Sequence, residues 1–143
     1  MANYRIRQAD WTRDGARLRA VREAVFVHEQ GVPLGLEWDG IDSQCTHVLA
    51  ESLEGEAIGT GRLLPDGHVG RMAVLRAWRG RGVGTALLQA LLEEARARRM
   101  TEIVLHAQEH ALPFYARFGF VVHGDPFDEA GIPHRTMRLQ LAR

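Results

Sequence analysis

The sequence RMAVLRAWRGRGVG occupies residues 71–84, and leucines at positions 87, 88, 91 and 92 follow it at helical spacing. The apolar residues 72–74 are typical of the end of a buried strand, and the leucines are typical of one face of a helix. The glycines at 80, 82 and 84 let the backbone approach a ligand without Cβ clashes. The first N–H groups of the helix would point at that ligand, and the helix dipole would favour a negative charge there. The stretch therefore predicts a strand, a diphosphate-binding turn and a helix.

Two common nucleotide-binding patterns do not fit this turn. A phosphate-binding loop of the Walker type ends in Gly-Lys-Ser/Thr, but Gly84 is followed by Thr85 and no lysine. The dinucleotide pattern G-x-G-x-x-G fails at its last glycine, which is Thr85 when counted from Gly80 and Leu87 when counted from Gly82. Arginines at 79 and 81 also argue against a purely structural loop, and a different diphosphate ligand is indicated.

The turn resembles R/Q-x-x-G-x-G/A, the acyl-CoA pyrophosphate motif of the GNAT superfamily of N-acyltransferases, with Arg79, Gly82 and Gly84 at the named positions. The segment ALPFYARFGF at 111–120 resembles the F-Y-x-x-x-G-F segment of the same superfamily. More narrowly, four short segments resemble the small bacterial ElaA-like subgroup: 27–33, 46–49, 106–108 and 131–137. Several motifs in the family's order, spread over roughly residues 20–140, make the resemblance specific.

The resemblance implies a single N-acetyltransferase domain over residues 1–143 of α/β class. Its central sheet would be mixed and mostly antiparallel, flanked by helices, with a splay between the strands at 68–74 and 102–107. The implied reaction is the acetyl-CoA-dependent transfer of an acetyl group to a primary amine of a small molecule, by direct attack in a ternary complex. Two alternatives stay open: a non-catalytic acyl-CoA-binding or sensing module, and an acetyltransferase that acts on a protein amine.

The resemblance also implies how acetyl-CoA binds. The strand end would pair its backbone with the pantetheine arm, the glycine turn would bind the pyrophosphate, and aromatic side chains would flank the sulfur. The residues implied are Met72, Ala73, Val74, Arg79, Gly80, Arg81, Gly82, Val83, Gly84, Thr85, Phe114, Tyr115 and Phe118.

Acetyl transfer to an amine poses two proton problems, because an alkyl ammonium must lose a proton and the departing thiolate benefits from gaining one. Tyr115 matches the family position for the general acid. Glu29 is a candidate base because it ends the first helical region, and His68 because it lies on the strand entering the cofactor site. His106, at the end of the adjacent strand, and His134 are further histidines that could serve as the base. The candidate acceptor-site residues are Glu29, Gln30, His106, Gln108 and His134.

Composition excludes other classes of partner. The chain of 143 residues has 18 basic residues, all arginine, and 18 acidic residues, so no net field recruits nucleic acid or an anionic membrane. It has one cysteine and no apolar window long enough to span a bilayer. We expect a cytoplasmic bacterial protein, a monomer or homodimer, that binds acetyl-CoA and an amine but no metal, nucleic acid or membrane.

Local patterns predict the remaining elements. Strands are expected at 3–7, 46–53, 57–64, 68–74, 102–107 and 135–141, and helices at 10–30, from 85 onward and at 111–118.

Three other patterns need an interpretation. Residues 106–110 match the zinc-peptidase pattern H-x-x-E-H, but we predict a strand running into His106, which would separate the two histidines. Cys45 is expected to be a small buried hydrophobe rather than a nucleophile. The segment Glu37-Trp38-Asp39 is interpreted either as a solvated turn or as a group that draws a cationic amine.

Overall fold

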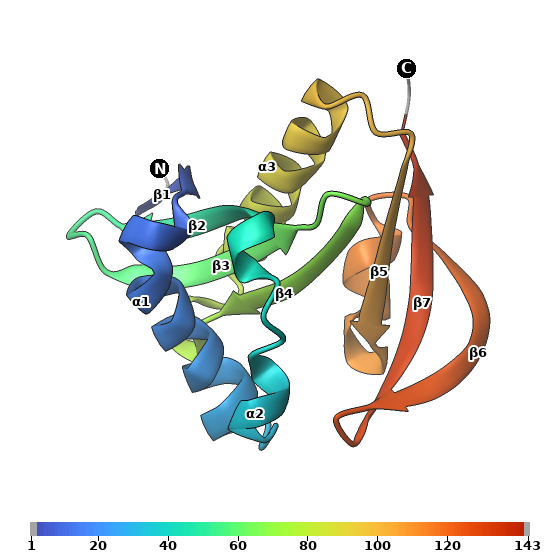
Figure 1. Ribbon diagram of the computed structural model, residues 1–143, viewed down its shortest axis with the longest axis horizontal. Coiled ribbons are helices and arrows are strands. Elements are labelled where there is room, and N and C mark those ends of the chain that lie inside the picture. The colour runs from blue at the N-terminus through green and yellow to red at the C-terminus, as the bar shows by residue number, and fades with distance from the viewer. Residues whose placement is uncertain (1–2, 142–143) are drawn as a thin grey trace.

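Seven strands form one sheet in the order β1-β2-β3-β4-β5-β7-β6 in the computed structural model, which describes residues 3–141 (Figure 1). The strands are β1 (Tyr4–Ala9), β2 (Thr46–Ser52), β3 (Ala57–Leu63), β4 (His68–Val74), β5 (Glu102–Gln108), β6 (Val121–Glu129) and β7 (Ile132–Gln140). The helices are α1 (Trp11–Arg22), α2 (Leu34–Glu37), α3 (Val83–Ala97) and α4 (Leu112–Ala116). A π-helical segment, Glu23–Glu29, continues α1.

The junction between β4 and β5 differs from every other strand pairing in the sheet. These two strands are parallel, whereas all the other neighbours are antiparallel. They pair only at His68 with Val104 and at Val69 with Leu105, and then diverge (Figure 1). The mixed, mostly antiparallel sheet with a splay between these strands is therefore confirmed.

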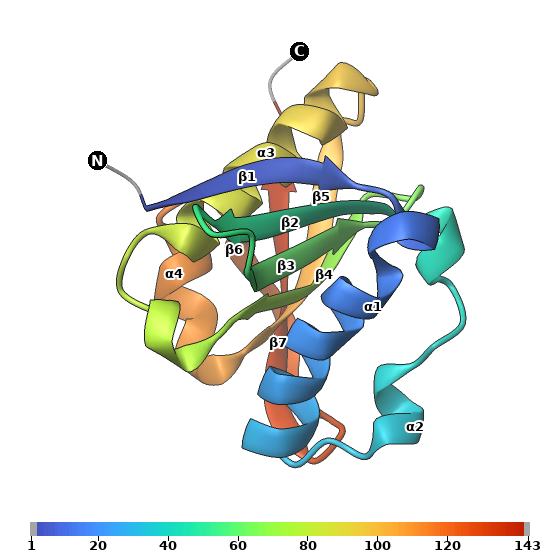
Figure 2. The ribbon, with the colours of Figure 1, turned by 90° about the vertical axis from the view of Figure 1, so that its left-hand side faces the viewer.

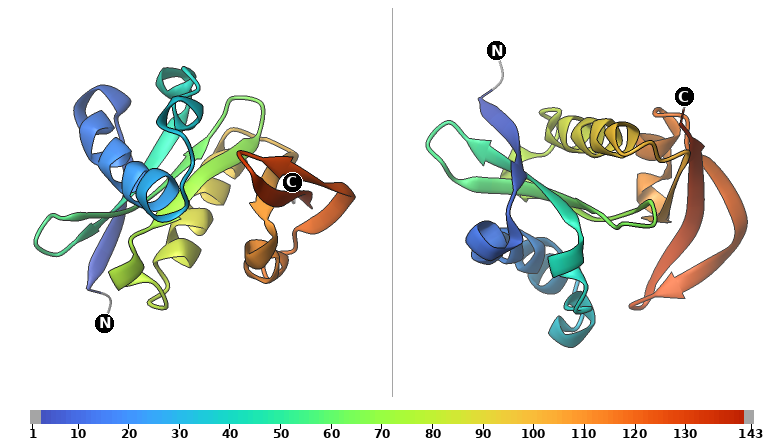
Figure 3. Two further views of the ribbon diagram at one scale, coloured as in Figure 1. Left: turned by 90° about the horizontal axis from the view of Figure 1, so that it is seen from below. Right: turned by 45° about the horizontal axis from the view of Figure 1, so that its top comes forward.

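The two faces of the sheet carry different helices (Figure 2). One face packs on α3 and α4 through the main core, which contains Leu87, Leu91 and Ile103. The other face packs on α1, where Val21 and Val25 contact Ala73 of β4. Figure 3 shows β5, β6, β7 and α4 standing apart from β1–β4, with the splay between the two groups.

One strand escaped the sequence-based prediction. Strand β6 is mostly exposed and contains Gly124, Asp125 and Pro126, so it lacks the apolar alternation that identifies a half-buried strand. It pairs with β7 through a hairpin turn at Ala130 and Gly131, both with positive φ. Strand β7 also begins earlier than the predicted residue 135, because the hairpin extends the ladder to Ile132.

The helix predicted over residues 10–30 is confirmed in its position and divides into α1 and the π-helical segment. Helix α3 begins at Val83, two residues before the predicted start, because Gly82 adopts the left-handed conformation that ends the turn. None of the helices between residues 3 and 141 is long and apolar enough to cross a membrane.

Candidate active site

The glycine turn forms the N-terminus of α3. Gly80 and Gly82 have φ of 76° and 83°, a region that L side chains enter only at a cost. The first helical hydrogen bond runs from the N–H of Ala86 to the carbonyl oxygen of Gly82, at 3.0 Å. The N–H groups of residues 83–85 precede it and have no acceptor within the helix, and no side chain caps them. The turn therefore presents main-chain donors at the positive end of a helix dipole, which suits a phosphate group.

Gly84 connects this turn to the aromatic residues of α4. A Cβ atom at Gly84 would lie 3.5 Å from Phe114 and 3.9 Å from Val74, at van der Waals contact with both, so Gly84 lies next to these two side chains. The rings of Tyr115 and Phe118 follow at 5.0 and 5.5 Å from that of Phe114. The structure thus brings together three separate stretches that were predicted to bind acetyl-CoA: the end of β4, the glycine turn and α4.

Strand β4 offers a free backbone edge beside this cluster. Ala73 and Val74 pair with β3 on one side, while the edge that faces β5 has no strand partner within the described residues. The ladder with β3 shifts register between Thr60 and Arg62, and Arg71 at the bulge has φ of 50°. The hydroxyl of Thr60 donates to the carbonyl oxygen of Arg71 at 3.1 Å and secures this unusual backbone.

Both arginines of the turn are held by other protein groups. Arg79 forms two hydrogen bonds to the carboxylate of Glu29, at 2.6 and 2.7 Å, and its Nε donates to the carbonyl oxygen of Val74 at 3.0 Å. The guanidinium of Arg81 lies 4.8 Å from the ring centre of Trp78. Their predicted contact with a pyrophosphate remains a prediction.

The ion pair with Arg79 changes the chemical character of Glu29. The hydrogen bonds from Arg79 lower the pKa of Glu29 to about 2, and Arg76 adds a weaker contact at 3.4 Å. A carboxylate with such a low pKa accepts protons poorly near neutral pH. This geometry argues against Glu29 as the general base and makes it a partner of Arg79.

Tyr115 has the protonation state that a general acid requires. Burial raises the pKa of Tyr115 to about 12, so its hydroxyl keeps its proton at neutral pH. None of the hydrogen bonds among residues 3–141 engages this hydroxyl. Its ring packs against Phe114 and Phe120, which fix its position beside the splay.

Two predicted acceptor-site residues meet across the open end of the splay. Gln30 follows the π-helical segment and Gln108 ends β5, and their side-chain amides exchange hydrogen bonds of 2.9 and 3.3 Å. These residues are 78 positions apart in the sequence. The pair bridges the α1 face of the sheet to the part of the molecule beyond the splay.

Three predicted histidines gather on the same face. His68 and His106 have ring centres 6.2 Å apart, and the ring of Phe127 lies 5.0 Å from His106 and 6.0 Å from His134. Glu129 contacts two of these histidines: its carboxylate lies 3.0 Å from Nδ1 of His106 and 3.7 Å from Nε2 of His134. Phe127 and Glu129 were missed from the sequence because they belong to the unpredicted strand β6.

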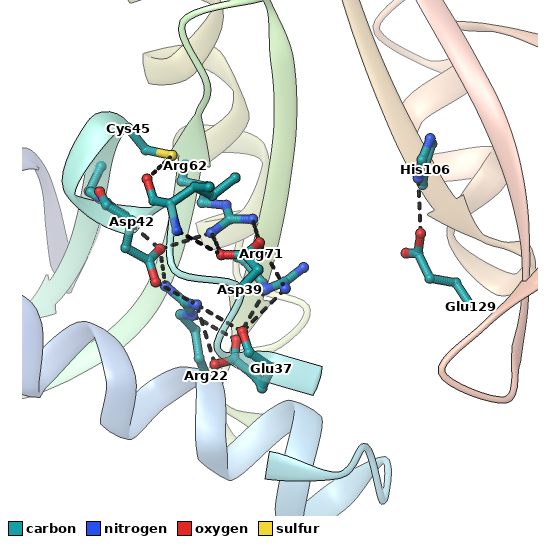
Figure 4. A network of polar contacts seen from close by, with 11 residues as sticks. Arg22, Glu37, Asp39, Asp42, Cys45, Arg62, Arg71, His106 and Glu129 are labelled. Carbon is teal, nitrogen blue, oxygen red and sulfur yellow. Dashed lines mark hydrogen bonds and ion pairs between the residues drawn. The ribbon is translucent and has the colours of Figure 1, made fainter. Parts of the chain in front are cut away.

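A buried ion network faces this histidine group from the other side of the gap (Figure 4). It joins α1, α2, the loop before β2, β3 and β4, and its members are Arg22, Arg62, Arg71, Glu37, Asp39 and Asp42. Arg22, 1% exposed, donates to Glu37 at 2.8 Å and to Asp42 at 2.7 Å. Three positive and three negative side chains balance each other in this network.

The network corrects both interpretations of the segment 37–39. Glu37 is buried and Asp39 is paired with Arg62 and Arg71, so the segment is not a solvated turn. The ring of Trp38 already carries two guanidinium groups of this chain, each 5.3 Å from its centre, so it is not a free cation site. Sequence pattern alone did not reveal this, because the partners come from three different elements, α1, β3 and β4.

The predicted strand through His106 is confirmed, whereas Cys45 is less buried than predicted. Strand β5 runs through His106 to Gln108 and a short 3₁₀ turn follows, so the histidines of H-x-x-E-H do not share a helical face. Over residues 3–141 no group of three His, Cys, Asp or Glu side chains is placed to hold a metal ion. Cys45 is half-buried, its thiol donates to the carbonyl oxygen of Ile41, and burial raises its pKa, which disfavours the thiolate.

Comparison with known proteins decides the family. A family model described as an acetyltransferase (GNAT) domain matches residues 10–141. The chain belongs to the GNAT acetyltransferase family. Protein ElaA of Escherichia coli is 32% identical over 132 residues, which cover 87% of this chain and 86% of ElaA. The uncharacterized N-acetyltransferase YjcF of Bacillus subtilis is 37% identical over 121 residues, which cover 82% of this chain and 86% of YjcF.

Solved structures agree with this GNAT assignment. An acyl-CoA N-acyltransferase from Pseudomonas aeruginosa has a TM-score of 0.82 at 32% identity, covering 94% of this chain and 97% of that protein. The crystal structure of Escherichia coli ElaA has a TM-score of 0.79 at 28% identity, covering 94% of this chain and 98% of ElaA. The resemblance to the GNAT superfamily and to ElaA is therefore confirmed.

Proposed function

We propose that this GNAT protein is an acetyl-CoA-dependent N-acetyltransferase that acts on a primary amine of a small molecule. One observation carries the proposal: Gly84, at the N-terminus of α3, has Phe114 of α4 and Val74 at the end of β4 as its nearest neighbours, so the turn, the aromatic residues and the free strand edge lie together. Each of these parts suits a different section of an acyl-CoA. Membership of the GNAT family supports transferase activity in general, and the acceptor class is our own inference.

The residues of the turn fit a diphosphate. Residues 83–85 supply N–H donors, and Gly80 and Gly82 keep the approach free of side chains. The edge of β4 over residues 72–74 would hold the pantetheine arm by backbone hydrogen bonds, as an added strand does. When bound, acetyl-CoA supplies a thioester with an electrophilic carbonyl carbon and a thiolate leaving group.

Proton transfer is divided between the two faces of the sheet, which meet at the splay. On the α4 side, the Tyr115 hydroxyl is protonated and donates to the leaving sulfur. On the α1 side, the amine needs a base, and the ion pair of Glu29 with Arg79 favours the histidine group over Glu29. His68, the other predicted base, belongs to that group. The amine then attacks directly, without an acyl-enzyme intermediate.

The bridge between Gln30 and Gln108 supports a small acceptor. It closes the open end of the splay on the face where the amine would enter. An extended polypeptide needs an unobstructed groove, whereas a small amine needs only the space between the bridge and the histidine group. This contact therefore favours a small molecule over a protein amine.

Thermal unfolding with acetyl-CoA tests the donor site, with ATP and NAD as diphosphate controls. At about 100 times its Kd, a ligand that binds only the native state adds about 2.7 kcal/mol of stability, which is easily measured. We expect stabilisation by acetyl-CoA alone, followed by release of free thiol in a screen of small amines. Absence of stabilisation at millimolar acetyl-CoA would refute the proposal, and binding without thiol release from any amine would favour the sensing module.

A further inference from the structure

The histidine group contains an arrangement that deepens the proposed function and rests on it. We propose that His106 is the general base, acting through Nε2, and that Glu129 is the positioning residue that holds its ring. Strand β6, which carries Glu129, reaches His106 across β7. The side chain of His106 is 41% exposed on this face, so its ring is accessible to an acceptor.

The contact between the two side chains determines where the proton lies on a neutral ring. Nδ1 of His106 is 3.0 Å from Oε1 of Glu129. A carboxylate only accepts hydrogen bonds, so Nδ1 must carry the hydrogen and donate it. Nε2 of the neutral ring then has a free lone pair, as a base requires. No other side chain among the described residues hydrogen-bonds to Nε2 of His106.

The register of the sheet explains why His106 is favoured over His68. The last pair between the two parallel strands is Val69 with Leu105, so His106 is the first residue of β5 beyond the junction. His68 lies before that point, within the paired part of the two strands. Its Nδ1 is also 3.0 Å from a carboxylate, that of Asp66, so its position in the strand, and not its tautomer, distinguishes it from His106. His106 therefore stands where the two strands separate, across from the bulge of β4.

The surroundings of His106 complete the argument. Gln108, two residues further along β5, projects from the same face and joins the bridge to Gln30. Glu129 contacts His106 and also lies 3.7 Å from His134, and the ring of His68, which contacts Asp66, is 6.2 Å from that of His106. The ion network faces His106 from across the gap (Figure 4). Phe127 packs on the ring at 5.0 Å and restricts its rotation. His134 is tied to the carbonyl oxygen of Ile132 through Nδ1, which leaves Glu129 to orient His106.

The proton balance of the reaction closes with these residues. The ammonium of the acceptor gives one proton to Nε2 of His106, which later passes it to solvent. The free amine then forms the C–N bond as the C–S bond breaks, and the sulfur leaves with the bonding pair. Tyr115 protonates that sulfur and is restored by the second proton lost from nitrogen. The products are an amide and a free thiol, with no oxidant or reductant consumed.

The tautomer of His106 is measurable without acetyl-CoA or an acceptor. We expect ¹⁵N NMR of the neutral ring to show the Nδ1–H form in the wild type and a loss of that form in Glu129→Ala. The matched control is Asp128→Ala, which removes the adjacent carboxylate, one that makes no ion pair among residues 3–141. An Nε2–H ring in the wild type, or a ring unchanged by Glu129→Ala, would overturn the positioning role.

Kinetics with any amine that the wild type acetylates test the base itself. We expect His106→Gln to lower kcat by about 10²-fold and Glu129→Ala by about tenfold, with acetyl-CoA binding retained in both. A larger loss in His68→Gln than in His106→Gln would overturn the assignment, as would near-wild-type turnover in His106→Gln. A wild type that acetylates no amine is a failure of the proposed function, and the NMR result distinguishes that case.

Discussion

The two faces of the sheet at the splay differ in whether backbone or side chains form the proposed site. The donor face that we propose is made mostly of backbone: a free strand edge, a glycine turn and the first N–H groups of α3, beside the rings of Phe114, Tyr115 and Phe118. The acceptor face is made of side chains from distant elements, such as the pair Gln30 and Gln108 and the pair His106 and Glu129. A backbone site suits a ligand common to a whole family, whereas a side-chain site can change its specificity through single substitutions.

The largest effect is expected from breaking the ion network that supports the acceptor face. Arg22→Met leaves Glu37 and Asp42 buried without their main partner, which costs about 3–5 kcal/mol of unfolding free energy. Arg19→Met is the matched control, because Arg19 is exposed but stacks on the same two tryptophans. Urea denaturation of both variants measures the difference, and equal losses would mean that the tryptophan contacts, not the ion pairs, dominate.

The next effect concerns the side chain that the donor face uses for chemistry. Tyr115→Phe keeps the packing against Phe114 and Phe120 but removes the acidic hydroxyl, so kcat should fall by about 10²-fold. Binding of acetyl-CoA, measured by calorimetry, should be unchanged. Tyr4→Phe removes the other phenol hydroxyl of the chain, which donates to the carbonyl oxygen of Arg81 in the donor turn, so any effect of this variant should appear in acetyl-CoA binding and not in kcat. Turnover near the wild-type value in Tyr115→Phe would remove Tyr115 from the mechanism.

A smaller effect is expected from the backbone of the donor turn. Gly82→Ala forces a side chain into a left-handed conformation and places its Cβ 3.3 Å from the hydroxyl of Tyr4. The strain of about 1–2 kcal/mol would shift the turn and weaken acetyl-CoA binding by about tenfold. Gly55→Ala meets the same backbone strain in a remote turn with open space around it. If both variants bind acetyl-CoA like the wild type, the glycine turn does not bind the pyrophosphate.

The smallest effect is expected where the two faces meet. Glu29→Gln should change kcat by less than about threefold, against about 10²-fold for a true base. The same variant should also change how the stability of the fold depends on pH in the acidic range. Because the folded pKa of Glu29 is lowered to about 2 from 4.5, its ion pair stabilises the fold fully above pH 4.5 and is lost as the pH falls toward 2. Unfolding of Glu29→Gln should therefore depend less on pH across that window, and an identical pH dependence would exclude the ion pair.

The same contrast explains what could be predicted from the sequence. The strand ending at Val74, the glycine turn and α3 are local, and their spacing alone indicates a helix N-terminus. The splay followed from family resemblance and is confirmed. The ion partners of Glu37 and Asp39 come from α1, β3 and β4, and no local pattern encodes such distant contacts. Glu129 was not predicted because strand β6 was not predicted. Most residues of β6 are exposed, so its sequence lacks the apolar alternation that indicates a strand.

The two-residue junction between β4 and β5 has a mechanical consequence. The sheet consists of two parts, β1–β4 and β5–β7, which are paired at one corner through His68 with Val104 and Val69 with Leu105. Beyond that corner, β4 and β5 are not paired within residues 3–141, and the side-chain amides of Gln30 and Gln108 bond to each other across the gap. A ligand bound between these two parts of the sheet would fill the gap between β4 and β5. Hydrogen exchange of the backbone amides should then slow together along the facing edges of β4 and β5, because the bound substrate restricts the motion of one part of the sheet relative to the other.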